Sequence, residues 1–223
     1  MDQTAEFLDS RAEPDHAARL AQISAIADIG EFRSGEAYAA KIHALVSLAR
    51  ELCADSRAEL PEVYSPSWLR PGTELLAVVA EEAESFLASR GYERNGKLNA
   101  TTGPQAGRLA SRLESAQWAT GGRPHPLAGR TARAGSYLKY VEHQNLPLHI
   151  DNREFGDLTV LVCVRYVPPA SGEASATMVA SPAGVSRFRL RPGQFLAFSG
   201  ATNPHGRTVL APGESITLLS LGF

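Results

Sequence analysis

Two histidines and one aspartate have the residue types and the spacing of a metal site. His149 and Asp151 are separated by one residue, and His205 follows much later in the chain. Side chains at positions i and i+2 of a strand point to the same face, so we expect His149 and Asp151 to lie side by side. Two imidazoles and one carboxylate on one side of a metal leave the opposite positions open, as in non-haem Fe(II) sites that activate O₂.

The H-x-D motif alone carries little weight, because it arises often by chance and a strand histidine is usually a hydrogen-bonded surface or core residue. Its context carries more. The motif ends one predicted strand, and His205 begins a later strand of the same strand-rich region. The fold must therefore bring the three side chains together.

The second half of the chain predicts these strands. After about residue 132 the segments become short and rich in β-branched residues, and Pro-Gly and Ser-Gly pairs separate them. We expect strands at 136–142, 146–152, 158–167, 176–181, 186–190, 194–199, 205–210 and 215–222. This spacing is typical of a jelly roll.

The first half predicts helices. Apolar residues recur at helical spacing over 17–29, 35–54, 73–90 and 105–117, whereas 61–71 and 91–103 are expected to be loops. The fold class is therefore α+β, a double-stranded β-helix (jelly-roll) core flanked by N-terminal helices. We expect residues 1–223 to form a single domain. In it, 1–131 would be mainly helical support and pocket wall, and 132–223 would carry the metal site.

The order of motifs after Tyr137 resembles the Fe(II)/2-oxoglutarate-dependent oxygenases, especially the branch with the prolyl hydroxylases and the AlkB-like dealkylases. The matching features are Tyr140, His149-Ile150-Asp151, Tyr166-Val167, Gly172-Glu173, the Pro192–Phe198 segment and His205. The resemblance implies that His149, Asp151 and His205 hold Fe(II). It also implies that 2-oxoglutarate is the cosubstrate, and that the enzyme uses O₂ to oxidise, most simply to hydroxylate, an unactivated C–H bond.

One expected residue of this family is missing. Its members usually carry a basic residue, shortly after a glycine, that pairs with the distal carboxylate of 2-oxoglutarate. Here Gly213 is followed by Glu214 and Ser215. Arg207 is the first substitute, because it lies two positions after His205 and so on the same strand face. Arg165 is the second.

Two further residues are candidates for the cosubstrate site. Tyr140 lies where AlkB-like relatives place a tyrosine that contacts 2-oxoglutarate. Arg189 is a third substitute for the basic residue, although we expect Arg187, Arg189 and Arg191 to be solvated charges on one strand face.

Composition limits the partners. The net charge of -2 and the lack of a basic cluster argue against nucleic acid, and charges interrupt every apolar run, which argues against a membrane span. Residues 1–13 lack the features of a signal peptide, so we expect a cytoplasmic protein. With only two cysteines, Cys53 and Cys163, we expect buried reduced thiols rather than a disulfide framework.

The substrate is left open. A small molecule, such as an amino acid or a natural-product intermediate, is the first hypothesis, and a peptide or protein side chain is the second. A cupin-like metal enzyme that does not use 2-oxoglutarate, favoured by the missing base, and a non-catalytic relative are the alternatives. The sequence does not predict the oligomeric state.

Overall fold

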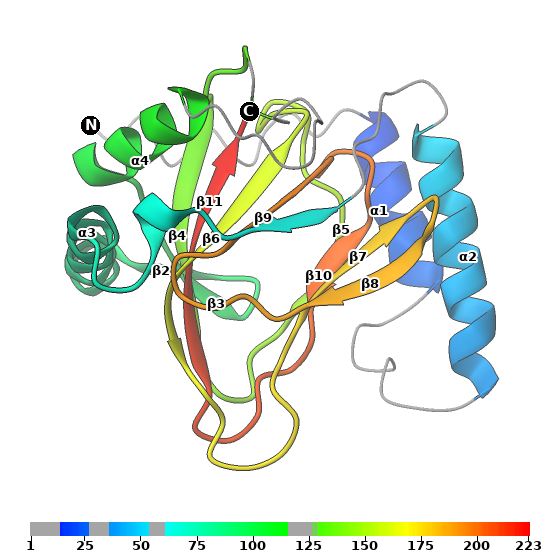
Figure 1. The fold of residues 1–223 in the computed structure, drawn as a ribbon. Coiled ribbons are helices and arrows are strands. Elements are labelled where there is room, and N and C mark those ends of the chain that lie inside the picture. Colours follow the sequence, from blue (N-terminus) through cyan, green and yellow to red (C-terminus); the bar gives the residue numbers. More distant parts are fainter. Residues whose placement is uncertain (1–13, 27–35, 54–60, 116–126, 128) are drawn as a thin grey trace.

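A computed structural model describes residues 14–26, 36–53, 61–115, 127 and 129–223 (Figure 1). It contains helices α1 (Pro14–Ile26), α2 (Glu36–Cys53), α3 (Glu74–Arg90) and α4 (Pro104–Ser115), and a short 3₁₀ helix at Ser67–Leu69. All four predicted helices are present. The predicted helix ends at 27–29, 35, 54 and 116–117, and the segment 1–13, lie outside the described residues.

Eleven strands are present in the described part of the chain. Three belong to the first half: β1 (Glu62–Tyr64), β2 (Tyr92–Arg94) and β3 (Lys97–Thr101). The other eight match the predicted strands one for one. They are β4 (Ala134–Tyr140), β5 (Leu146–His149), β6 (Thr159–Val167), β7 (Thr177–Ser181), β8 (Gly184–Phe188), β9 (Phe195–Phe198), β10 (His205–Arg207) and β11 (Ser215–Gly222).

The strands form two antiparallel sheets. The larger sheet has the order β1-β9-β6-β11-β4-β3-β2, and the smaller has the order β5-β10-β7-β8. The expected combination of helices with antiparallel sheets is confirmed. Consecutive strands pass between the two sheets, for example from β4 in the larger to β5 in the smaller and back to β6. Residues far apart in sequence therefore become neighbours.

Helices cover the outer faces of both sheets (Figure 1). Helices α3 and α4 lie on the larger sheet, and α1 and α2 lie against the smaller one. The sequence of β6 is almost continuously apolar because both faces of this strand are buried. Val160 and Val162 pack toward α3 and α4. Leu161 and Cys163 pack between the sheets. A strand buried on both faces shows no polar alternation. Cys53 and Cys163 are both buried thiols, as expected.

Two segments that we expected to be loops form strands instead. Residues 61–71 contain β1, which pairs with β9, and residues 91–103 contain β2 and β3, which extend the sheet beyond β4. Asn95 and Gly96 join β2 to β3 with positive φ angles of 52° and 68°. Two such residues form the type I′ turn that suits the twist of a hairpin. The Asn-Gly pair was the signal for this hairpin in the sequence.

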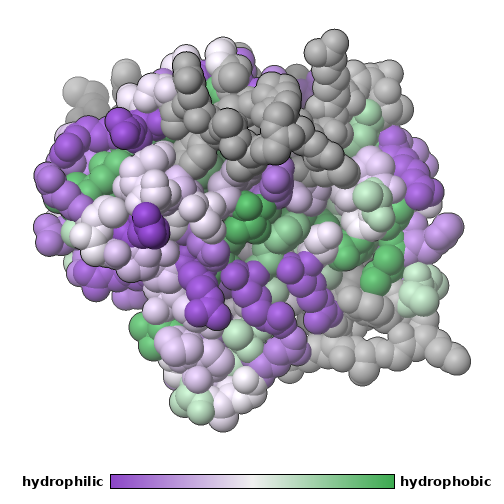
Figure 2. Space-filling view, viewed as in Figure 1, coloured by the Kyte–Doolittle hydropathy of each residue, from purple (hydrophilic) through white to green (hydrophobic). Residues whose placement is uncertain are grey.

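Few large apolar side chains are exposed among the described residues. The face in Figure 2 is mainly hydrophilic over α3 and α4, and its apolar atoms lie in small groups. The exposed large apolar side chains, Tyr92, Val141 and Val167, are few and far apart in sequence. No helix in the described ranges combines the length and apolar character that crossing a bilayer requires.

Candidate metal centre

His149 and His205 lie opposite each other on two adjacent antiparallel strands. His149 ends β5 and His205 begins β10, and the two residues are paired in register. Their ring centroids are 4.3 Å apart. Phe198 packs edge-on against His205, with the two ring centroids 4.7 Å apart, and so restrains the His205 ring. His205 is the more buried of the two histidines. The strand pairing therefore brings both imidazoles to one point.

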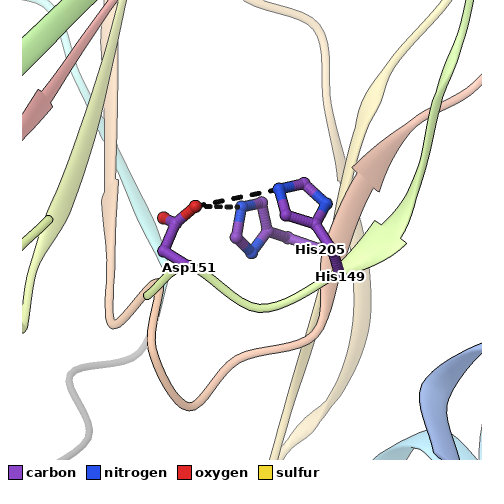
Figure 3. Close-up of side chains that lie close together, drawn as sticks. All are labelled: His149, Asp151 and His205. Carbon is purple, nitrogen blue, oxygen red and sulfur yellow. Dashed lines mark ion pairs between the residues drawn. The ribbon is translucent and has the colours of Figure 1, made fainter. Parts of the chain in front are cut away.

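Asp151 completes the cluster from the loop that follows β5 (Figure 3). Its Oδ1 lies 3.7 Å from His149 Nε2 and 3.6 Å from His205 Nε2. One ligand atom from each of the three residues falls within 4.8 Å of the others. The predicted strand at 146–152 ends at His149, so strand alternation is the wrong reason for this placement. Instead, the Asp151 N–H donates to Gly200 O at 2.9 Å and anchors the loop.

Hydrogen bonds orient all three ligand side chains. The Nδ1 atoms of His149 and His205 lie 2.9 Å from the carbonyl oxygens of Pro147 and Asn203, respectively. A proton on Nδ1 would satisfy each contact and leave the Nε2 lone pairs facing Asp151. The Thr159 hydroxyl donates to Asp151 Oδ2 at 2.5 Å. Such outer contacts orient metal ligands and are found in most metal sites.

The charges of the cluster suit a cation. Burial, together with His205, lowers the pKa of His149 to about 4, so its imidazole is neutral near pH 7. Burial alone would raise the pKa of Asp151, but the two histidines and the Thr159 hydroxyl hold it well below its usual range. Metal ligands must be deprotonated to bind. The neutral imidazole of His149, the imidazole of His205 and the carboxylate of Asp151, all on one side, therefore fit Fe(II) with open positions.

Arg207 lies in a buried polar network near the triad, with 2% of its surface exposed. Its guanidinium donates to the hydroxyls of Thr177 at 3.0 Å and Ser175 at 2.9 Å, and its carbon lies 5.8 Å from the centroid of the Tyr140 ring. Arg207 Nε is buried and has no hydrogen-bond partner among the described residues. An unpaired donor on a buried guanidinium fits a missing acidic ligand.

Tyr140 is buried beside Arg207. Burial raises the pKa of Tyr140 above its ordinary value, so its phenol stays protonated and can donate a hydrogen bond. The structure therefore places Tyr140 and Arg207 next to each other, and Tyr140 belongs to the core between the two sheets.

Arg165 does not join this group. Thr217 of β11 pairs with Arg165 and Leu218 pairs with Cys163, so Val164 is an extra residue in β6. This bulge breaks the alternation, and Arg165 is exposed and forms an ion pair with Glu84 of α3. Tyr166 instead turns toward the space between the sheets and hydrogen-bonds with Glu214. Sequence periodicity could not reveal the bulge.

The remaining arginines behave as solvated charges. Arg187, Arg189 and Arg191 are exposed, and Arg189 pairs with Glu173. A cavity of about 570 Å³ lies beside Arg187 and Arg189, and none of the three triad residues lines it. The candidate site is therefore marked by the donor set of the triad and not by this cavity.

Glu214 is one of the site residues that sequence reasoning missed. Its carboxylate is 1% exposed and accepts hydrogen bonds from the Ser175 N–H at 3.0 Å, the Ser175 hydroxyl at 2.8 Å and the Ala211 N–H at 3.0 Å. Ser175 thus links Glu214 to Arg207. The Glu214 carboxylate and the Arg207 guanidinium, both buried, share the Ser175 hydroxyl. Glu214 stands where the family that the sequence resembles usually has a basic residue.

Lys97 was also missed. It lies at the start of β3, is 7% exposed, and holds its ammonium group 5.7 Å from the centroid of the Tyr140 ring. Burial, together with Arg94, lowers the pKa of Lys97 to about 8, although Asp151 opposes this shift. Because 91–103 was expected to be a loop, nothing in the periodicity pointed to this lysine.

Known proteins share this fold. No protein-family model matches the sequence, and no curated protein matches it significantly. Among solved structures, the non-heme alpha-ketoglutarate-dependent epimerase SnoN from nogalamycin biosynthesis is 16% identical with a TM-score of 0.54, over 78% of this chain and 81% of that one.

Two other solved structures are similar to the same degree. A Trichoplax adhaerens prolyl hydroxylase, in complex with a hypoxia-inducible-factor peptide fragment, is 14% identical with a TM-score of 0.50, over 86% of this chain and 94% of that one. HygX from Streptomyces hygroscopicus, with nickel, 2-oxoglutarate and hygromycin B bound, is also 14% identical with a TM-score of 0.50. The match covers 72% of this chain and 81% of HygX. The resemblance to the Fe(II)/2-oxoglutarate oxygenases is thereby confirmed at the level of the fold.

Proposed function

We propose that this chain is a non-haem Fe(II)- and 2-oxoglutarate-dependent dioxygenase that hydroxylates an unactivated C–H bond of a small molecule. The observation that carries the proposal is the convergence of His149, Asp151 and His205, with both Nε2 atoms facing one carboxylate oxygen, in a chain with the fold of such enzymes. A two-histidine, one-carboxylate set with open positions is the donor set of this chemistry.

We assign iron to His149, Asp151 and His205, and the distal carboxylate of 2-oxoglutarate to Arg207. Tyr140 is the second cosubstrate contact. The buried, unpaired Nε of Arg207 supports this assignment, because a carboxylate would satisfy it. Iron, 2-oxoglutarate and O₂ would supply the oxidising chemistry, with succinate and CO₂ as co-products. The protein would orient the ligands and hold the cosubstrate in place.

We also propose that the two sheets form a double-stranded β-helix within a single domain of residues 1–223. The passage of consecutive strands between sheets supports the first part. The pairing of β1 with β9 and of β3 with β4 supports the second, because strands from 1–131 then complete the sheet formed by 132–223.

A small-molecule substrate is the first choice. SnoN is an epimerase from nogalamycin biosynthesis and the HygX structure contains hygromycin B, which supports this choice. The Trichoplax complex contains a peptide, which keeps a peptide side chain as the alternative. The net charge of -2 does not favour nucleic acid. Glu214, the acid in place of the expected base, favours a second candidate, a cupin-like metal enzyme without 2-oxoglutarate.

Anaerobic titration of the metal-free protein with Fe(II), and then with 2-oxoglutarate, tests the proposal. We expect a weak visible charge-transfer band only when both are present, and no band in His205→Ala. Iron binding without the band would reject the cosubstrate and favour the cupin-like enzyme. A protein that binds no iron would reject the metal centre and leave a non-catalytic role.

A further inference from the structure

Lys97 is a buried cation without an acidic partner. It is 7% exposed, and no Asp or Glu among the described residues forms an ion pair with it. Removing an ammonium group from water is costly unless an opposite charge compensates. Lysines are almost never this buried without a partner, so the side chain is a candidate for binding a ligand.

The backbone holds Lys97 firmly in place. Asn95 and Gly96 form the tight turn before it, and the Asn99 side-chain amide donates to the carbonyl oxygens of Lys97 at 3.0 Å and Arg94 at 3.3 Å. Leu98 pairs with Lys139 of β4, so Lys97 is the next position along that ladder, beside Tyr140. The Lys97 side chain therefore extends from the hydrogen-bonded hairpin of β2 and β3 and not from a loop.

Lys97 and Arg207 lie around the same aromatic ring. The Lys97 ammonium is 5.7 Å and the Arg207 guanidinium carbon 5.8 Å from the Tyr140 centroid. The exposed Arg94 adds positive potential beside Lys97. Lys97 thus places a second positive charge beside the Tyr140 ring.

The two cations differ in what surrounds them. Arg207 is held by Ser175 and Thr177, and Ser175 connects it to the buried carboxylate of Glu214. Glu214 therefore offsets part of the Arg207 charge through Ser175, and the distal carboxylate of 2-oxoglutarate would offset the rest. Lys97 has the face of Tyr140 and the attraction of Asp151 but no ion pair, and a cation–π contact at this distance compensates little of a buried charge. A second anion is needed beside Lys97.

We propose that Lys97 is a substrate-binding residue that pairs with a carboxylate of the substrate, so that the substrate is a small carboxylic acid. This inference rests on the proposed function, in which Arg207 binds the distal carboxylate of 2-oxoglutarate. The substrate carboxylate then lies beside Tyr140, and the ion pair holds the rest of the molecule toward His149 and Asp151. An amino acid or another organic acid has the required group.

The small number of lysines makes a direct test practicable. The chain contains only Lys41, Lys97 and Lys139, so reductive methylation with ¹³C-formaldehyde gives three lysine signals in an NMR spectrum. The signal that disappears in Lys97→Arg is that of Lys97. The protein is loaded with Zn(II), a diamagnetic substitute for Fe(II), and with 2-oxoglutarate. Acetate is then the probe, and acetamide is its neutral control.

We expect acetate to shift the Lys97 signal saturably and to raise the pKa of Lys97 by roughly one unit, as an adjacent opposite charge does. Acetamide should leave the signal in place, and Lys41 and Lys139 should not respond. An unchanged Lys97 signal, or an equal response to acetamide, would overturn the proposal. So would a Lys97 signal that 2-oxoglutarate alone shifts completely, because Lys97 would then belong to the cosubstrate.

Lys97→Met provides the second measurement. It removes the charge and keeps an apolar stem, and we expect its Fe(II)·2-oxoglutarate charge-transfer titration to match that of the wild type within twofold. A tenfold weaker binding of 2-oxoglutarate would assign Lys97 to the cosubstrate instead. Failure of the proposed function would look different: neither protein would develop the band, whereas the acetate titration could still be read on the metal-free protein.

Discussion

His149 and His205 are paired residues of one β-ladder, with their ring centroids 4.3 Å apart. His205, this close on the neighbouring strand, disfavours protonation of His149 and so contributes to the lowered pKa of His149. Because the strands set the distance, we infer that the nitrogen ligands are preformed before metal binds. The carboxylate of Asp151 comes from a loop and depends on other side chains.

Thr159→Val tests that dependence. The change keeps the shape of the side chain and removes the hydroxyl that donates to Asp151 Oδ2. We expect the Fe(II) dissociation constant to rise about 10- to 100-fold, as for other outer contacts of metal ligands. Anaerobic Fe(II) titration measures it. Thr177→Val is the matched control, because Thr177 is equally buried but bonds to Arg207; equal effects in both variants would contradict the prediction.

Gly200→Ala should disturb the same carboxylate more strongly. A methyl group at Gly200 would overlap both Asp151 Oδ2 and Thr159 Oγ1, so both side chains must move. We expect a greater loss of Fe(II) affinity than in Thr159→Val, again by anaerobic titration. Gly107→Ala is the control, because nothing lies near that position in α4 and the change should stabilise the helix by about 0.5–1 kcal/mol. Normal iron binding by Gly200→Ala would show that the loop is adaptable.

Arg207→Met and Arg165→Met separate the two predicted anchors. Losing a charged hydrogen bond to a ligand costs about 1.5–3 kcal/mol, so we expect the dissociation constant of 2-oxoglutarate to rise about 10- to 100-fold in Arg207→Met. Arg165 faces α3 and pairs with Glu84, so its variant should bind as the wild type does. Titration of the charge-transfer band gives both values. The reverse result would make Arg165 the anchor and our assignment wrong.

Glu214→Gln distinguishes a structural from a positioning role. The amide would turn one donor toward the N–H groups of Ser175 and Ala211, so we expect a loss of about 1–3 kcal/mol in the free energy of unfolding, measured with urea. Removal of a negative charge near Arg207 should leave the affinity for 2-oxoglutarate unchanged or tighter. A weakening as large as that in Arg207→Met would mean that Glu214 positions the arginine.

Lys97→Met should make the protein more stable. The pKa of Lys97 is lowered to about 8, so below pH 8 the folded protein holds a charge that burial disfavours. This cost is relieved as the pH rises from 8 toward the ordinary lysine value of 10.5, where the unfolded chain also loses its proton. We expect a gain of about 1–3 kcal/mol at pH 7 that shrinks above pH 8.

Urea unfolding at several pH values measures this gain. Lys139→Met, on the neighbouring strand, is the control and should change stability by less than about 0.5 kcal/mol. A destabilised Lys97→Met protein would show that the folded chain itself compensates the charge. The stabilisation would instead mark a residue kept for binding at the expense of stability.

Much of the site was predictable because its signals are local. Turn residues separate all eight strands of the second half, and the order of the motifs along the chain is enough to indicate His149, Asp151 and His205. Arg207 was proposed from strand alternation, which holds along β10 because this short strand is regular between His205 and Arg207 on its β7 side.

What could not be predicted depends on partner strands. Arg165 points outward because β6 contains one residue more than the facing part of β11, and a bulge of this kind has no signature in its own strand. Lys97 lies on a five-residue strand that forms by pairing with β4, so it carries too little periodicity to recognise. Glu214 was missed because two of its partners, Ser175 and Tyr166, lie far from it in the sequence.

The hydrogen bonds at Nδ1 of the two histidines have a consequence for how this centre can change. Each ring is held by the carbonyl oxygen of the residue two positions earlier, Pro147 in β5 and Asn203 just before β10, and a carbonyl is present whatever the side chain. Substitutions around the rings therefore have little effect on the orientation of the two imidazoles. The position of the Asp151 carboxylate, in contrast, depends on the side chain of Thr159 and on the absence of a side chain at Gly200. Selection for another metal or a looser site would be expected to act there first.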